Sequence, residues 1–234
     1  MKIMKKIISI VLALACAFAM FSCGGESADP IDKAIKEISD MYNAVSPSMV
    51  HTVTTRDFGS YSLVDESTLK VGNVDGYAAS VLEYSNQQIR DIDSGAMSEI
   101  LDPIKSETGK LEYHEDLGLR ETKNGASGKW DEDGEDFAPA TGANALKITK
   151  ETVKDFTIDE ANKTYKFTVL AENTEAVLGY SIAFDVNVVI VHSGADIISV
   201  ELSYKETGSV KNHPEISVVV KAEYSYESQL ITID

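Results

Sequence analysis

Residues 31–45 carry apolar side chains three or four positions apart, with lysines and acids between them. This period is typical of an amphipathic helix that buries one face. Asp29 and Pro30 suit an N-cap and a first helical residue, and Ser46 with Pro47 predicts the end. Because the polar face mixes both signs of charge, we expect the helix to pack on a sheet rather than lie on a membrane surface. The predicted apolar face consists of Ile31, Ile35, Ile38, Met41, Tyr42 and Val45.

Beyond Pro47 apolar positions tend to alternate with polar ones, which predicts β-strands. In residues 216–226 every even position is apolar, and Val219 is the one apolar odd position, as in a sheet covered on one side. Asp75-Gly76 and Asn124-Gly125 are typical hairpin turns. The expected strands are residues 49–58, 60–71, 77–85, 110–119, a stretch around 129–130, 156–159, 165–171, 180–192, 196–205 and 215–226, with a last turn near 207–208.

Two stretches interrupt the strands. Residues 86–105 suit short helical pieces broken at Gly95 and Pro103, and residues 150–154 suit a helical turn that Thr149 caps. The whole pattern predicts an α+β, β-dominated fold. Its large, curved antiparallel sheet, a half-barrel-like meander, is covered by the N-terminal helix and short helical segments. With only five prolines and 15 glycines there is little material for long linkers, so we expect one domain over residues 29–234.

The first 22 residues have the pattern of a signal peptide. Three lysines precede an apolar run at 7–21, and Ser22 then stands before Cys23. A run of 15 residues is shorter than the roughly 20 that a membrane-spanning helix needs. The segment resembles the lipobox family of bacterial lipoprotein signals, in which a small residue precedes the cysteine. That resemblance implies cleavage before Cys23, a diacylglyceryl group on its thiol and often acylation of the new amino terminus.

Three alternatives to this interpretation remain. The leader could span the bilayer if tilted, Cys16 could be the acceptor, or an ordinary secretory signal could leave Cys23 as an inert thiol. Removal of the leader also removes Cys16, so Cys23 would be the sole thiol of an exported protein, and modification would account for it. Residues 23–28 then form the lipidated cysteine and a tether whose five residues reach about 17 Å. We therefore expect a domain held close to the outer face of a bacterial membrane, in the envelope or at the cell surface.

The charge of the chain excludes one class of partner. Without the three leader lysines, 18 basic residues face 38 acidic ones, a net charge of −20. Such a surface repels phosphate backbones, so we expect no nucleic-acid binding. An acidic excess of this kind is also a common means of keeping a protein soluble.

Candidate chemistry is sparse. The acidic stretch 131–136 could be a calcium site, but Gly134 does not fit the EF-hand register, and a solvated hairpin turn is the favoured alternative. Asn162-Lys163-Thr164 is interpreted as a turn rather than a glycosylation site. A glycosidase carboxylate pair has no specific signal among so many acids. We therefore expect no cofactor, no metal and no catalytic residue. The four histidines, none at the paired spacing of a zinc site, are His51, His114, His192 and His213.

The triad residue types His192, Ser193 and Asp196 lie in one short predicted turn. Side chains in so short a turn point apart rather than converge on one substrate atom. We therefore do not expect a nucleophilic triad there.

The order of features resembles the LolA-like and LppX-like group of bacterial lipoproteins. The features on which the resemblance rests are the lipobox, the single amphipathic helix, the two meanders with a helical interruption, and the turn, strand and hairpin at 146–169. The resemblance implies a half-barrel closed by helices over a cavity for lipid or lipid-linked molecules, and it has no signature residue. We expect a membrane-anchored, non-catalytic protein that binds a lipid or another apolar ligand. The alternative is an envelope interaction module that binds a protein or glycan without such a cavity.

Overall fold

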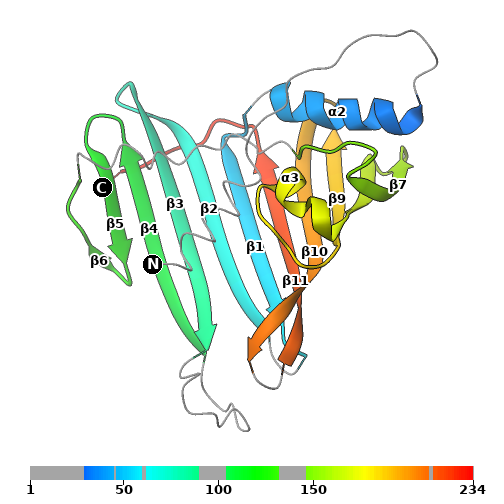
Figure 1. The fold of residues 1–234 in the computed structure, drawn as a ribbon. Helices are drawn as coiled ribbons and strands as arrows, with labels where there is room; N and C mark the ends of the chain where they lie inside the picture. Colours follow the sequence, from blue (N-terminus) through cyan, green and yellow to red (C-terminus); the bar gives the residue numbers. More distant parts are fainter. Residues whose placement is uncertain are drawn as a thin grey trace.

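The computed structural model describes residues 29–44, 46–59, 62–89, 104–131, 146–210 and 213–233. It contains one sheet of 11 strands in which all neighbours run antiparallel, as Figure 1 shows. The strand order is β6-β5-β4-β3-β2-β1-β11-β10-β9-β8-β7. Each half of the chain is thus a meander, and the first strand of one half pairs with the last strand of the other.

The element bounds are as follows. The N-terminal half contains α2 (Pro30–Ala44), β1 (Met49–Asp57), β2 (Ser62–Val74), β3 (Tyr77–Ile89), β4 (Ile104–His114), β5 (Gly118–Lys123) and β6 (Ala126–Ser127). The C-terminal half contains β7 (Val153–Asp159), β8 (Thr164–Val169), η3 (Ala171–Asn173), α3 (Thr174–Leu178), β9 (Val186–Ser193), β10 (Asp196–Val210) and β11 (His213–Ser225). The predicted β-dominated class, with one large antiparallel sheet and few short helices, is confirmed.

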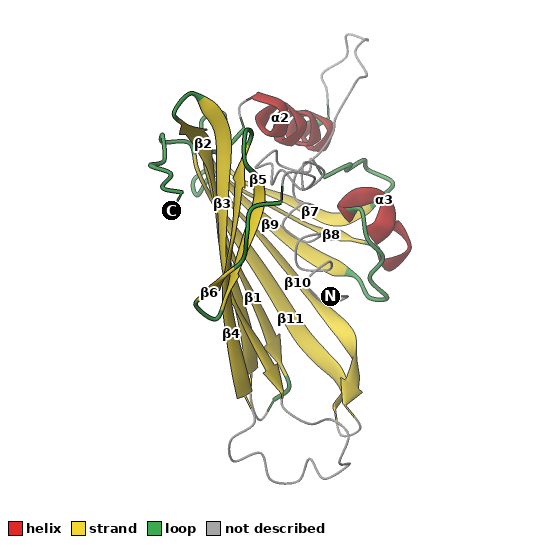
Figure 2. Ribbon diagram, turned by 90° about the vertical axis from the view of Figure 1, so that its left-hand side faces the viewer, coloured by secondary structure: helices red, strands yellow, loops and turns green. Residues whose placement is uncertain are grey.

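Helix α2 forms where the sequence predicts it. The Asp29 carboxylate accepts a hydrogen bond from the Ile31 backbone N–H at 2.9 Å, which satisfies one of the free donors of the first turn. The helix buries Ala34, Ile38, Met41 and Tyr42. It crosses the upper ends of β9 and β10 and lies with α3 on one side of the sheet (Figures 1 and 2). We call that side the inner face.

The main core lies between these helices and the C-terminal half of the inner face. There the even-numbered residues of β11 from Ile216 to Tyr224 point inward, as the alternation predicts, and Val219 on the other face is 37% exposed. Ile38 of α2 and Val177 of α3 belong to the same packed cluster. The strand residues of that cluster include Tyr165, Phe167, Val169, Val186, Val188, Ile190, Val200, Leu202, Val218 and Val220.

Several element boundaries differ from the sequence prediction. Residues 110–119 are not one strand, because a turn at 115–117 separates β4 from β5. The Asn124-Gly125 hairpin is confirmed, but it joins β5 to β6, and Lys129 and Trp130 lie outside any strand. The prediction of a turn near 207–208 is also wrong, because β10 continues to Val210 through an irregularity in its pairing with β11.

The predicted helical and strand segments also need correction. Ile89 and Ile104, placed in short helical pieces, lie opposite each other in β3 and β4; residues 90–103 are outside the described residues. Residues 150–152 form a turn, and residues 153–154 already belong to β7. The Thr152 hydroxyl, not that of Thr149, closes the turn by donating to the Thr149 carbonyl at 3.0 Å. Residues 180–192 are not one strand, because β9 begins only at Val186 after α3 and an irregular segment.

Candidate ligand-binding cleft

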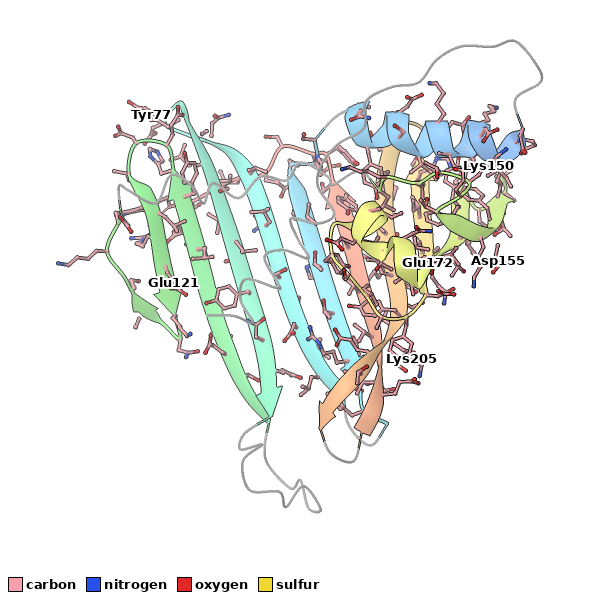
Figure 3. The ribbon with its side chains drawn as sticks, viewed as in Figure 1. Tyr77, Glu121, Lys150, Asp155, Glu172 and Lys205 are labelled. Atoms are coloured by element: carbon pink, nitrogen blue, oxygen red, sulfur yellow. The ribbon has the colours of Figure 1, made fainter. Side chains whose placement is uncertain are left out.

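A cleft of about 330 Å³ lies between the segment that follows α3 and the lower part of β10. Tyr180, Ile182 and Phe184 supply one wall, and Tyr204 of β10 supplies the opposite wall. Figure 3 labels Lys205, which lies at this end of β10 and contributes to the rim with Glu206. The size lies at the lower end of the range of small-molecule sites, and aromatic and aliphatic side chains dominate such sites.

Local hydrogen bonds hold the wall formed by residues 179–184. Gly179 ends α3 in the left-handed conformation, with φ of 81°, and its N–H donates to the Glu175 carbonyl. Thr174 is 1% exposed, and its hydroxyl lies 2.9 Å from the Ala171 carbonyl oxygen. The same hydroxyl oxygen accepts the Ile182 N–H at 2.9 Å. One buried threonine therefore ties the start of α3 to the segment that lines the cleft.

The two tyrosines of the cleft remain neutral at physiological pH. Burial, with a smaller contribution from Glu206, raises the pKa of Tyr204 to about 12, and Arg56 partly opposes the shift. Burial likewise raises the pKa of Tyr180, with smaller contributions from Tyr204 and Glu206. Among the described residues, the Tyr180 hydroxyl is buried without a hydrogen-bond partner. The described wall of the cleft is thus mainly aromatic and aliphatic, and the Tyr180 hydroxyl is buried within it.

The inner face becomes more polar on the side of β1 and β2. Arg56 pairs with Asp65 at 2.5 Å, and the other oxygen of Asp65 accepts the Gln87 N–H at 3.0 Å. Thr52 and Thr54 of β1 are also buried there. The cleft therefore lies at the lower boundary of the apolar core, on the helix-covered half of the sheet.

The residues singled out from the sequence do not form a site in the described structure. Cys23, Cys16 and residues 132–136 of the acidic stretch lie outside the described residues, and Asp131 forms a backbone bridge with Leu119. Within residues 29–44, 46–59, 62–89, 104–131, 146–210 and 213–233, no group of three His, Cys, Asp or Glu side chains could hold a metal ion.

The described histidine rings lie in separate places. His51 contacts Thr68, and His114 packs against Tyr77. The His192 ring stacks on Tyr165 with centroids 4.9 Å apart, and its Nδ1 lies 3.4 Å from the Gly194 carbonyl oxygen.

The cleft residues were missed at the sequence level. The sequence pattern predicts a strand over residues 180–184, whereas Gly179 directly after an apolar stretch is a typical helix end and is the signal for α3. Tyr204 was placed correctly in a strand, but its partner wall is about 20 residues away in sequence and reaches it only through the fold.

No helix among the described residues has both the length and the apolar character to cross a membrane. No family model matches the sequence, and no curated protein matches it.

Solved structures show weak similarity. LprF from Mycobacterium bovis is 14% identical, with a TM-score of 0.38 over 87% of this chain and 96% of its own. A DUF1329 family protein from Desulfovibrio piger is 8% identical, with a TM-score of 0.26 over 86% and 96%. The MucA/MucB complex of Pseudomonas aeruginosa gives 9% identity and a TM-score of 0.15 over 82% and 94%. Scores this low carry no argument about function.

Proposed function

We propose that this protein is a lipid-anchored, non-catalytic protein on the outer face of a bacterial membrane that binds a lipid or another apolar ligand. The observation that supports the proposal is the cleft of about 330 Å³ lined by Tyr180, Ile182, Phe184 and Tyr204. A partly enclosed apolar cavity of this size suits a small molecule better than a flat protein partner.

The cleft would bind its ligand mainly by removing hydrocarbon from water. Each buried methylene group contributes about 0.8 kcal/mol, so a short alkyl or acyl segment would supply most of the binding energy.

Native mass spectrometry before and after solvent extraction tests the ligand directly. We expect a co-purifying apolar molecule, and a fluorescent fatty acid should bind to the extracted protein. Phe184→Ser should weaken that binding roughly 10- to 100-fold, the equivalent of about 1.5–3 kcal/mol of lost aromatic contact. Val219→Ser, on the outer face, is the matched control and should leave the affinity unchanged. No co-purifying lipid together with no fatty-acid binding would refute the proposal.

The anchor is proposed at Cys23, the residue that follows the small position of the lipobox. Two or more acyl chains give stable membrane attachment, whereas a single chain is marginal. We expect the wild-type protein in the detergent phase after phase partition and Cys23→Ala in the aqueous phase. If Cys23→Ala stays in the detergent phase, lipidation at this residue is wrong.

A second candidate function is an interaction module that binds a protein or glycan through the outer face. A shallow hollow of about 330 Å³ on that face is lined by Val53 and Val219 among charged neighbours such as Lys221 and Glu223. In that case Val219→Glu would abolish partner binding, and Phe184→Ser would leave it unchanged. Variants at Val219 and Phe184 therefore distinguish the two candidate functions.

A further inference from the structure

Strand β10 has an open edge at the cleft. Its pairing with β9 ends at Ser203, which lies opposite Asn187, whereas its pairing with β11 continues to Val210. Figure 1 shows the lower end of β10 extending beyond β9. Within the part of the chain that the structure describes, no other strand pairs with residues 204–210 on the β9 side. A strand edge of this kind presents unpaired backbone N–H and C=O groups, which are a template for pairing with another chain.

Local hydrogen bonds keep the segment before β9 away from this edge. The Ile182 N–H donates to the Thr174 hydroxyl oxygen at 2.9 Å. The Asp185 carboxylate accepts the Ala171 N–H at 2.9 Å, and it pairs with Lys154 at 2.6 Å. These three contacts hold the segment against α3, η3 and β7, so the segment does not continue β9 along β10.

The cleft follows the edge of β10 as well as its inner face. Four consecutive residues of the strand, 204–207, line it. Side chains of a strand alternate between its two faces, so a space bordered by four consecutive residues runs along the strand edge. Lys205, Glu206 and Thr207 are exposed. The edge is therefore accessible from solvent.

The cleft combines an apolar wall with one acidic side chain. The wall opposite β10 contains Tyr180, Ile182 and Phe184. Lys205 already pairs with Glu215 of β11 at 3.3 Å, whereas Glu206 forms no ion pair with any described residue. The expected mature chain carries a net charge of −20, which adds to the attraction for a basic partner.

We infer that an extended peptide binds in the cleft by adding a strand to the open edge of β10, with apolar side chains against the aromatic wall and a basic side chain beside Glu206. In this mode of recognition, backbone hydrogen bonds to the strand edge supply affinity and alternate side chains supply specificity. The partner class is a peptide segment in which apolar residues alternate with lysine or arginine. The inference deepens the proposed function, on which it rests only for the location of the binding site.

The test uses a fluorescently labelled peptide of seven residues that alternates valine with lysine. Fluorescence polarisation with the purified, solvent-extracted protein measures its affinity. A peptide that alternates valine with glutamate is the control for charge. We expect the lysine peptide to bind roughly tenfold more tightly or better, because Glu206 and the acidic surface repel the other peptide.

Two N-methylated forms of the lysine peptide test the backbone pairing. One carries N-methyl groups on every valine and the other on every lysine. In a strand the N–H groups of alternate residues point to opposite sides, so only one of the two forms loses its donors to β10. That form should bind at least roughly tenfold more weakly, since several edge hydrogen bonds are lost, and the other form should match the parent peptide.

Two matched protein variants test the charge. Glu206→Gln should weaken the lysine peptide about three- to fivefold, as expected for an exposed ion pair, without a change in melting temperature. Glu201→Gln removes the same charge from the outer face of β10, where Glu201 lies opposite Lys221, and it should leave the affinity unchanged. Equal effects of the two variants would show that only the overall charge attracts the peptide, which overturns the inference.

The outcomes separate the inference from the proposed function. If the lysine peptide does not bind, or if the two N-methylated forms bind equally, strand addition at β10 is wrong. The proposed function then still stands when the fluorescent fatty acid binds and Phe184→Ser weakens it. If the peptide binds with the expected pattern and the fatty acid does not bind, the inference stands and lipid is not the ligand of the cleft.

Discussion

Replacing Gly109 by Ala should displace the Tyr84 ring from the inner face. The two residues lie opposite each other in β4 and β3. A Cβ atom at Gly109 would stand 2.1 Å from Tyr84 Cζ and 2.2 Å from its hydroxyl oxygen. Atoms cannot approach so closely, so the tyrosine ring must rotate away from the strand. The absence of a side chain at Gly109 therefore leaves the space that the Tyr84 ring occupies on the sheet.

The cost follows from what Tyr84 loses. The side chain is 8% exposed, and leaving its site forfeits about 1.5–3 kcal/mol of apolar burial. The hydrogen bond to Glu121 at 3.2 Å contributes about 0.5–1.5 kcal/mol more. Alanine recovers about 0.5–1 kcal/mol, because it restricts the unfolded chain more than glycine does. The net loss is about 2.5 kcal/mol.

Urea denaturation followed by circular dichroism measures this loss, and the melting temperature should fall by about 5–10 °C. The control is the same substitution in a Tyr84→Ser background, where no ring stands in the way and Gly109→Ala should cost less than about 0.5 kcal/mol. An equal cost in both backgrounds would show that the alanine acts on the strand itself rather than on Tyr84, which would refute the reasoning.

Three further predictions concern the helices and the cleft. Tyr165→Phe should lower the free energy of unfolding by about 1–2 kcal/mol in denaturant titrations, because the hydroxyl donates to Glu37 of α2 at 2.7 Å; no change would show that this bond adds nothing. Thr174→Val should destabilise the protein by about 1–3 kcal/mol and weaken fatty-acid binding by holding the cleft wall less firmly, and retention of full affinity would contradict the second effect. Lys150, labelled in Figure 3, donates a hydrogen bond to Asp29 that lowers the pKa of this carboxyl. A depressed carboxyl pKa stabilises the fold above the unfolded value, near pH 4, and this contribution is lost as the pH falls through the folded value. Lys150→Met should therefore raise the pKa of Asp29 in an NMR titration, and an unmoved pKa would count against the pair.

Local signals account for the parts of the fold that the sequence predicted well. The N-cap at Asp29, the apolar period of α2 and the Asp75-Gly76 turn depend on neighbours a few residues apart. The turn at residues 115–117, between β4 and β5, has a weaker sequence signal because it contains the apolar Leu117. Gly118, directly after the turn, is the residue in the left-handed conformation, with φ of 84°. Helix α3 has only five residues, which are too few to distinguish the helical spacing of apolar side chains from the alternation of a strand.

The candidate site could not be predicted in the same way. Tyr180 and Tyr204 are ordinary aromatic residues in sequence, and only the fold places them across one cleft. The burial of the Tyr42 and Tyr224 hydroxyls, on α2 and β11, is likewise a property of packing, which no spacing reveals.

The sequence by itself determined the elements and their faces, because a helix or a strand buries one face according to the period of its own residues. It thereby determined the amphipathic α2, the two meanders and the inward side of β11. The tertiary structure decided that β1 pairs with β11 to join the meanders into one sheet. That pairing brings together residues about 170 positions apart, and it creates the inner face on which the cleft lies. Backbone pairing over such a distance leaves no periodic trace in either strand, so only the folded chain shows it.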